Sequence, residues 1–256
     1  MQRPTELLRV SATRYVTPLR EGGSLPGLVE ADDCGLYVTK FRGAGQGTRA
    51  LVAEVIVGEL ARAIGLPVPD QVIVEIDPAL GLAEPDPEIQ DLIVGSGGEN
   101  LGVDFLPGAA GYSPAAGWRV DPGLAADIVW LDALVTNVDR TPRNPNLLLW
   151  HDRLWLIDHG AALYHQHRGL RPAEHATQPF PQIAEHVLLP SAGPIPDADG
   201  RLAARIDPEL LASVAALVPV DWFAGERADT YVEYLTRRLQ SPRRFVAEAE
   251  DARVSA

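Results

Sequence analysis

The sequence predicts an α+β fold whose first part is rich in short strands and whose second part is mostly helical. Three observations support this fold class. Runs of β-branched and alternating residues before position 100 are typical of strands. The apolar residues of 48–64 recur so that they would form one buried face of a helix, which predicts a single long helix among these strands. Beyond position 120, the apolar residues of 124–135 return with a helical period, and 208–218 and 229–239 are also predicted to be helices.

The strands of the first part are separated by turn-forming residues. Five segments match the strand pattern: 10–19, 28–30, 36–41, 68–76 and 91–94. We expect a hairpin turn at 31–35 and a loop at 95–100. The helix at 48–64 has Thr48 as its candidate N-cap, and Gly65-Leu66-Pro67 is its stop signal.

The second part contains a helix, a polar loop and a hairpin in succession. Asp121-Pro122 is the start signal of the helix. The apolar runs 146–150 and 154–157 are separated by a polar turn, which predicts a hairpin. Farther along the chain we expect a long irregular connector over 172–196 and a frayed tail from Glu248.

Asp139, Asn144 and Asp158 form the pattern that points most directly to a chemistry. Asp139 and Asn144 stand five residues apart in a proline-broken loop, and Asp158 follows the second strand of the hairpin. Phosphoryl transfer from ATP needs ligands for Mg²⁺ and a carboxylate that orients the attacking hydroxyl. We therefore expect Asp139 to face the hydroxyl, and Asn144 and Asp158 to hold metal. The alternative is an ordinary surface loop, in which the same residue types are common.

Lys40 is the single lysine of the chain, since 21 of the 22 basic residues are arginine. A lysine in such a composition indicates a place that needs a compact ammonium on a flexible stem rather than a planar guanidinium. A phosphate-binding position is such a place. Lys40 also ends the alternating strand 36–41, which agrees with this role.

Two glutamates of the helix at 48–64 compete as the partner of Lys40. Glu59 lies within the apolar stripe, and a buried glutamate needs a partner, which favours Glu59 on burial alone. Glu54 lies at the edge of the stripe. From the residues alone, both stay candidates.

The turn Gly22, Gly23 and Ser24 lies between two predicted strands. The backbone amides of a glycine turn can approach phosphate groups, so we expect a phosphate lid here. A plain loop is the alternative, because most such turns bind nothing.

Composition restricts the class of partner and the compartment. The net charge is −13 and no basic stripe is visible, so we expect no direct contact with nucleic acid. No stretch is long and apolar enough to predict a membrane span. Cys34 is the single cysteine, so an internal disulfide is excluded, and we expect a cytoplasmic protein.

The segments NVDRTPRNPN and LIDHG resemble the catalytic and metal-binding segments of HipA-like kinases, particularly the short actinobacterial ones. The same pattern is similar to type II phosphatidylinositol 4-kinases. Other segments share the resemblance to HipA-like kinases: GGSLPGLVEADDCGLYVTKF, EVIVGELARAIGLPVP, NLGVDFLPGA and VDWF with the later YVEYLTRRL. The resemblance implies a two-lobed, protein-kinase-like fold that binds ATP and magnesium.

Carried over position by position, the resemblance implies a role for each matching residue. Lys40 matches the lysine that binds the ATP phosphates, and Glu54 matches its helix partner. Asp139 matches the catalytic aspartate, whereas Asn144 and Asp158 match the metal ligands.

The resemblance also implies an N-lobe over 1–107 and a C-lobe over 108–256. Residues 100–108 resemble the hinge between the lobes, where backbone groups would hold adenine. Asp104 and Leu106 mark that hinge.

The resulting expectation is an ATP- and Mg²⁺-dependent kinase that acts on a Ser/Thr hydroxyl of a protein. Two alternatives stay open: a kinase of small molecules or lipid headgroups, and a pseudokinase that works as a binding module. The longer HipA toxins carry an extra N-terminal subdomain that helps dock an antitoxin, and 256 residues leave no room for it. Thr141 also stands where many relatives have histidine. A toxin role and an antitoxin-like partner therefore stay open.

Overall fold

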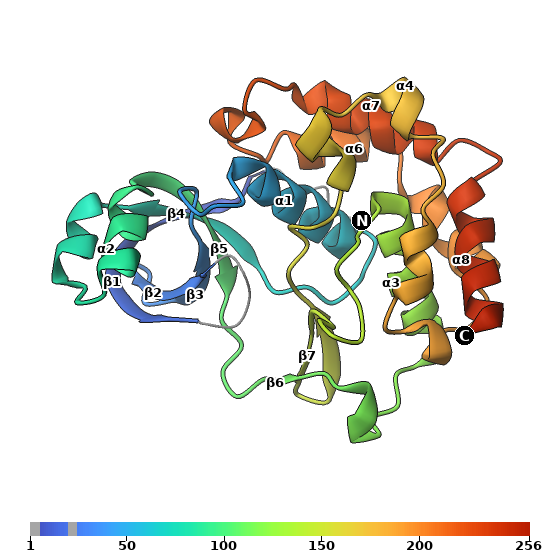
Figure 1. Ribbon diagram of the computed structural model, residues 1–256, viewed down its shortest axis with the longest axis horizontal. Coiled ribbons are helices and arrows are strands. Elements are labelled where there is room, and N and C mark those ends of the chain that lie inside the picture. The colour runs from blue at the N-terminus through green and yellow to red at the C-terminus, as the bar shows by residue number, and fades with distance from the viewer. Residues whose placement is uncertain (1–5, 20–24) are drawn as a thin grey trace.

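Five strands close into a barrel in the first part of the computed structural model, which describes residues 6–19 and 25–256 (Figure 1). The order around the barrel is β1-β2-β3-β5-β4, and β1 closes it by pairing in parallel with β4. The other neighbouring strands are antiparallel. The strands are β1 (Leu8–Pro18), β2 (Gly27–Ala31), β3 (Leu36–Lys40), β4 (Gln71–Ile76) and β5 (Gly98–Asp104). Four of the five predicted strands are thus confirmed.

The fifth predicted strand, 91–94, is wrong, because these residues end helix α2 (Pro87–Val94). The Asp86 side chain caps this helix by accepting a hydrogen bond from the Glu88 N–H, and a proline takes the first helical position. The strand that completes the barrel begins at Gly98, inside the predicted loop. A short apolar run fits either a strand or a helix, and here the Asp-Pro start signal determines the outcome.

Helix α1 (Thr48–Ala63) lies between the barrel and the helical part (Figure 1). Every residue from Ala50 to Ala61 is buried, so this helix is covered on all sides over most of its length. It contacts β4 of the barrel and also α6 (Pro208–Ala215) of the helical part. Its N-cap is Gly47 rather than the predicted Thr48, and the cap makes no side-chain hydrogen bond. Polar residues of α1 therefore need partners inside the protein.

The second part begins with helix α3 (Pro122–Val135), which Asp121 caps as predicted. The predicted hairpin is also confirmed, as β7 (Leu147–Trp150) and β8 (Arg153–Leu156). The short strand β6 (Ala110–Gly111) pairs with β7 to make a three-stranded sheet. The loop between α3 and β7 is thus held at both ends by regular structure.

Five α-helices lie in the remaining chain. They are α4 (Pro172–His175), α5 (Ile195–Leu202), α6 (Pro208–Ala215), α7 (Ala228–Arg238) and α8 (Arg244–Ser255). The predicted helices at 208–218 and 229–239 correspond to α6 and α7. The predicted connector at 172–196 is not wholly irregular, since α4 and the 3₁₀ turn Pro181–Glu185 lie in it.

The predicted frayed tail is wrong, because the residues after Glu248 belong to α8. Phe245 and Ala249 of this helix are buried. The Phe245 ring packs edge-on against Trp130 of α3, with centroids 5.6 Å apart, and the Arg238 guanidinium lies 5.4 Å from the Phe245 centroid. Five of the twelve residues of α8 are charged and only Phe245 and Ala249 are buried, so its narrow buried face was hard to recognise in the sequence.

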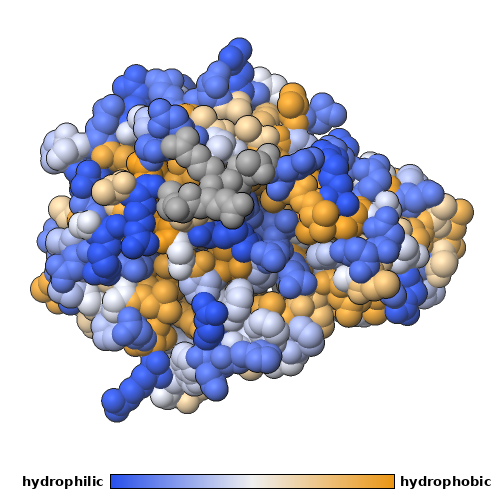
Figure 2. Space-filling model, turned by 180° about the vertical axis from the view of Figure 1, so that it is seen from behind, coloured by the Kyte–Doolittle hydropathy of each residue, from blue (hydrophilic) through white to orange (hydrophobic). Residues whose placement is uncertain are grey.

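Buried apolar residues form two clusters. The smaller fills the barrel, whereas the larger joins α1 to the helical part. Figure 2 shows hydrophilic side chains over much of the rear face, interrupted by separate apolar patches. In the described ranges, no helix combines the length and apolar character needed to cross a membrane.

We predict that Phe245→Ala lowers the free energy of unfolding by roughly 3–5 kcal/mol, because it removes a buried ring and leaves a cavity. Urea denaturation followed by circular dichroism measures this change. Val254→Ala is the matched control in the same helix, since Val254 is 71% exposed and its truncation should cost less than about 0.5 kcal/mol. Equal effects of the two substitutions would mean that α8 does not pack as described.

His165 and His167 stand two residues apart in the chain, and the structure places His165 in a ring stack. The His165 ring lies parallel to that of His175, with centroids 4.4 Å apart and an interplanar angle of 14°. In the described part of the chain, no group of three or more His, Cys, Asp or Glu side chains is placed to hold a metal ion. Burial, together with the charges of His175 and Arg238, lowers the pKa of His165 to about 4, and Glu174 opposes this with a smaller effect.

The stability of the protein should therefore fall as the pH drops from about 6.5, the ordinary histidine pKa, towards 4. In this window the unfolded chain binds a proton at His165 that the folded chain excludes. His165→Phe keeps a stacking ring and removes the titration, so we expect it to reduce the loss of stability between pH 7 and pH 5 by on the order of 1 kcal/mol. Urea denaturation at both pH values measures it, with His167→Phe as the exposed-histidine control. An unchanged pH dependence in His165→Phe would contradict the prediction.

Candidate active site

Three charged side chains from separate elements meet beside α1. Lys40 is the last residue of β3, Glu54 lies in the middle of α1, and Asp158 follows β8. The Lys40 ammonium forms an ion pair with the Glu54 carboxylate and lies 2.7 Å from Asp158 Oδ1. The side chains of Lys40 and Glu54 are 12% and 2% exposed, whereas that of Asp158 is 42% exposed. Lys40 therefore joins a buried carboxylate to one that solvent and ligands can reach.

The backbone after β8 is shaped to reach this pair. Asp158 has a φ of 56°, a left-handed conformation that aspartate adopts more readily than most residues. The following His159 N–H donates to Glu54 Oε2 at 3.0 Å. A Cβ atom at Gly160 would lie only 3.0 Å from Glu54 Oε1, so a glycine allows the close approach. All three residues of the Asp-His-Gly motif thus touch Glu54 or its lysine.

The charges of the three groups depend on one another. Burial acts to lower the pKa of Lys40, but the charges of Glu54 and Asp158 outweigh it and raise this pKa above its ordinary value. Burial raises the pKa of Glu54, although the Lys40 charge opposes this. For Asp158, the Lys40 charge outweighs burial and holds the pKa well below its usual range. Lys40 and Asp158 are consequently charged at neutral pH.

Asp139 lies in the loop between α3 and β7, where two asparagine amides bind one of its carboxylate oxygens. Asn144 Nδ2 donates to Asp139 Oδ2 at 2.7 Å, and Asn146 Nδ2 donates to the same atom at 3.2 Å. Asp139 Oδ1 accepts no hydrogen bond from the residues that the structure describes. This oxygen can therefore accept a hydrogen bond from a bound hydroxyl.

Asn146 is a residue that the predicted spacing missed. It is 8% exposed, whereas Asn144 is on the surface, and it directly precedes β7. Its φ of 50° is again left-handed, and its Nδ2 also donates to the Asp139 backbone carbonyl at 3.4 Å. The expected spacing of five residues after Asp139 selects the first asparagine of Asn-Pro-Asn. The second asparagine stands immediately before an apolar strand, and this position was the signal in the sequence that could have identified it.

A buried polar cluster lies behind this loop and was also missed. Its members are Asp132, Asn137, Arg140, His159 and His186. Asp132 accepts hydrogen bonds from Asn137 Nδ2 and His186 Nε2, both at 2.9 Å, and from Arg140 Nε. Burial acts to raise the pKa of Asp132, but Arg140 and His186 hold it well below its usual range. Asp132 was unrecognised because it lies within an apolar helical pattern, and His186 because it is remote in sequence.

Arg140 connects the loop to the hairpin. Its Nη1 donates to the backbone carbonyl of Asn146 and, at 3.3 Å, to that of Ile157. Its Nη2 lies 3.3 Å from His159 Nδ1, which must accept because a guanidinium can only donate. Burial and the Arg140 charge lower the pKa of His159 to about 3, so this ring is neutral.

The choice between the two glutamates is resolved by their contacts. Glu54 pairs with Lys40, whereas the Glu59 carboxylate accepts from Arg62 Nε at 3.3 Å. Gln71 Nε2 donates to the backbone carbonyl of Glu54 at 3.0 Å and ties α1 to the barrel. The predicted lid Gly22-Gly23-Ser24 lies outside the described residues.

The predicted hinge lies where β5 leaves the barrel. Asp104 is the last residue of β5, and its N–H donates to the Asp70 carbonyl at 2.8 Å. The Phe105 N–H donates to the Leu36 carbonyl at 2.9 Å. For the next residue, Leu106, no hydrogen bond from its N–H to another described residue is present. The first free backbone donor after the barrel is thus at Leu106.

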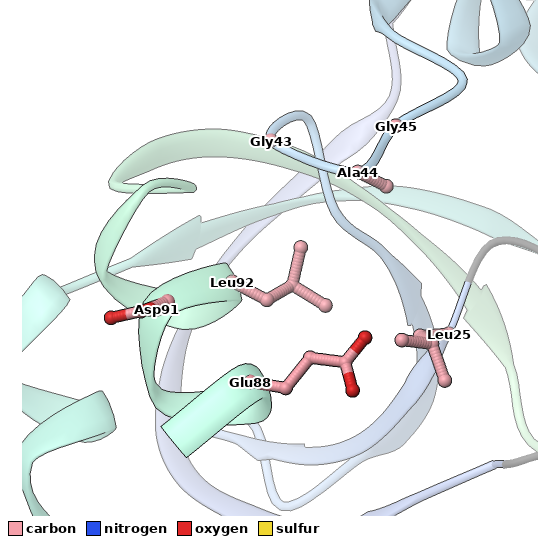
Figure 3. A pocket seen from close by; sticks show the side chains of 7 residues that line it. All are labelled: Leu25, Gly43, Ala44, Gly45, Glu88, Asp91 and Leu92. Atoms are coloured by element: carbon pink, nitrogen blue, oxygen red, sulfur yellow. The ribbon is translucent and has the colours of Figure 1, made fainter.

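Two cavities are lined by residues that follow site residues closely in the chain. One of about 290 Å³ lies between the loop after β3 and α2, and Figure 3 shows Glu88 and Leu25 on opposite sides of it. The described residues that line it include two carboxylates and no basic group, which does not suit phosphate. A second cavity, of about 630 Å³, is lined by Thr141, Pro142 and Arg143 of the Asp139 loop and by residues 184–186 and 189–190.

The fold is that of protein kinases. The crystal structure of CtkA, a Helicobacter pylori proinflammatory kinase, is similar with a TM-score of 0.56 and 12% sequence identity, over 90% of this chain and 94% of CtkA. The crystal structure of the Golgi casein kinase is similar with a TM-score of 0.50 and 13% identity, over 98% of this chain and 74% of that one. At these identities the likeness supports the fold alone. Among curated proteins, no sequence matches.

The sequence itself supports a narrower assignment. The model of the HipA-like kinase family matches residues 13–231, which include β2 to β5, α1, the Asp139 loop and the hairpin. The matched region thus contains Lys40, Glu54, Asp139 and Asp158. Because the match covers far more than half of the chain, this protein belongs to the HipA-like kinase family.

Proposed function

We propose that this HipA-like kinase depends on ATP and Mg²⁺ and phosphorylates a Ser/Thr hydroxyl of a protein. The observation that carries the proposal is the contact of Lys40 with both Glu54 and Asp158, residues 14 and 118 positions away in the chain. In protein kinases, activity requires that a strand lysine pairs with a helix glutamate and that a metal-binding aspartate is in place at the same time. Membership of a kinase family supports the same reaction.

Lys40 is proposed to bind the phosphate oxygens of ATP, with Glu54 holding its ammonium in place. The Leu106 N–H at the end of β5, together with the backbone near Asp104, is proposed to bind adenine. Gly22, Gly23 and Ser24 stay the proposed phosphate lid. The roles proposed for Leu106, Asp104 and the glycine turn rely on position or on backbone groups, whereas those of Lys40 and Glu54 rely on their side chains.

The oxygen ligands present suit Mg²⁺, which prefers carboxylate and amide oxygens. The Asp158 carboxylate is partly exposed, and the amide nitrogens of Asn144 and Asn146 both donate to Asp139, which leaves their oxygens without a donor in the described part of the chain. We propose Asp158 and Asn144 as metal ligands, with Asn146 as the competing amide. Bound Mg²⁺ would neutralise charge on the phosphate oxygens during transfer.

Asp139 is proposed to orient the acceptor hydroxyl and to accept its proton through Oδ1. The two asparagine amides occupy Oδ2 and so fix the direction of the free oxygen. The cavity of about 630 Å³ beside Thr141, Pro142 and Arg143 is the proposed entrance for the acceptor. Phosphorylation of a metabolite or lipid headgroup, rather than of protein, is the alternative outcome of an acceptor screen.

We also propose a cytoplasmic location without direct nucleic-acid contact. The single cysteine, Cys34, excludes an internal disulfide, and disulfides are typical of small oxidised secreted domains. The net charge of −13 disfavours binding to phosphate backbones.

The proposal predicts that Asp139→Ala lowers phosphotransfer by about 10² to 10⁴-fold, because a positioned proton acceptor is removed. Transfer of labelled phosphate from ATP to protein, including the enzyme itself, measures the rate. Asp197→Ala, on the surface of α5, is the matched loss of a carboxylate and should leave the rate unchanged. Wild-type turnover in Asp139→Ala would refute the proposed role.

The two asparagines can be separated by their dependence on Mg²⁺. If Asn144 supplies the amide oxygen, Asn144→Ala raises the Mg²⁺ concentration needed for half-maximal activity at least about tenfold, within the range typical of lost ligand interactions. Asn146→Ala then changes this concentration much less. The reverse order would assign the metal to Asn146, and no change in either variant would contradict metal binding by this loop.

A further inference from the structure

Asp132 lies at the centre of the buried cluster behind the candidate active site. Its side chain has no exposed surface, and each contact that it makes comes from a donor. Oδ1 accepts from Asn137, whereas Oδ2 accepts from Arg140 and His186. An ionised carboxylate is the side chain that can accept from three donors at once.

One path leads from Asp132 to the proposed catalytic aspartate. Asn137 Nδ2 donates to Asp132 at 2.9 Å, and this fixes the orientation of the Asn137 amide. The opposite end of that amide, Oδ1, accepts from the Asp139 backbone N–H at 3.1 Å. The position of Asp139 along the loop is therefore set through one intermediate side chain.

A second path leads to the proposed metal-binding segment. Arg140 is held by Asp132 through its Nε and reaches the carbonyls on both sides of the hairpin, at Asn146 and Ile157. It also donates to His159, whose N–H donates to Glu54. Ile157 and His159, which flank Asp158, are thus both hydrogen-bonded to Arg140, the partner of Asp132.

His186 completes the cluster from a distant segment. Its Nδ1 accepts from the Leu188 N–H at 3.1 Å, so its Nε2 carries the proton and donates to Asp132 Oδ2 at 2.9 Å. The neighbouring Val187 N–H donates to the Arg140 carbonyl at 3.0 Å. Segment 186–188 therefore holds both Asp132 and Arg140.

We infer that Asp132 is a positioning residue that fixes Asp139 and Asp158 relative to each other, with His186 as its donor. This role rests on the proposed function, since the two aspartates have to act on the same phosphoryl group. Asp132 touches neither the hydroxyl acceptor nor the nucleotide in this assignment. It acts through Asn137 and Arg140.

Asp132→Asn tests the inference because an asparagine of the same shape turns an amide N–H towards donors. We expect kcat for phosphotransfer to fall about 10²-fold through misplacement of the loop. The KM for ATP should change less than about threefold, because Lys40 is untouched. Hydrogen exchange measured by mass spectrometry should become faster in residues 137–146.

Asp199→Asn is the matched control for loss of a part-buried carboxylate. Asp199 accepts from Arg243 at 2.7 and 2.8 Å and from Trp130 Nε1 at 2.9 Å, away from the Asp139 loop. The Asp199→Asn variant should be less stable than the wild type, but its kcat and the hydrogen exchange of residues 137–146 should have wild-type values. A similar loss of kcat in both variants would mean that Asp132 only stabilises the fold.

A pair of substitutions at His186 provides the test if Asp132→Asn does not fold. Glutamine can place an N–H close to the position of histidine Nε2, whereas asparagine is too short. His186→Gln should keep kcat within about threefold of wild type, and His186→Asn should lose at least about tenfold.

Equal activity of the two variants would overturn the inference, as would wild-type kcat and exchange in a folded Asp132→Asn. Absence of turnover in the wild-type enzyme would refute the proposed function instead, and the exchange of 137–146 would still test the positioning role.

Discussion

The buried contact of the Lys40 ammonium with Glu54 is the interaction on which the arrangement of the molecule depends. Separating such a pair would leave a charge in a place that water does not reach, at a cost of several kcal/mol. β3 and α1 must therefore keep one relative position. Asp158, the third member, ties the hairpin of the second part to the same ammonium. The barrel, the central helix and the segment that follows the hairpin are thus joined at one nitrogen atom.

Around Asp139 the signs of the charges are reversed, because carboxylates there are surrounded by donor groups. There, donors converge on carboxylates: two asparagine amides on Asp139, and an amide, a guanidinium and an imidazole on Asp132. A carboxylate that accepts donors on only one of its oxygens has a defined free oxygen on the other side. Asp139 has such a free oxygen, whereas Asp132 is fully enclosed. This difference separates a residue that can meet substrate from one that can only hold its neighbours.

The sequence predicted most of the fold because most elements carry either alternation or a helical period. The strand at 36–41 and the helix before the Asp139 loop are examples. Segment 91–94 was misread because a short apolar run has no period, and only the cap upstream identifies it as helical. The last helix was missed because its buried face consists of little more than Phe245 and Ala249 among charged residues.

Candidate site residues could be proposed from the sequence where residue type alone carries the chemistry. Lys40 was proposed as the single lysine and Asp139 from its loop. The residues alone left Glu54 and Glu59 open. Both are buried in the structure, where Glu54 contacts Lys40 and Glu59 contacts Arg62. Asp132 could not be recognised, because its role depends on contacts that only the folded chain creates.

The use of cations inside the protein follows from geometry. Arg140 is buried and donates from all three of its nitrogens, to a carboxylate, two carbonyls and an imidazole. Arg238 likewise donates to three carbonyls of the helical part. Fixed architecture of this kind needs the rigid, always charged fork of arginine, and a lysine could not span the same acceptors. At position 40 the proposed reaction reverses the requirement, because there the ammonium that contacts two carboxylates would have to reorient towards a phosphate. In a chain with 21 arginines, the single lysine therefore lies at a site where the proposed reaction needs a cation that can move.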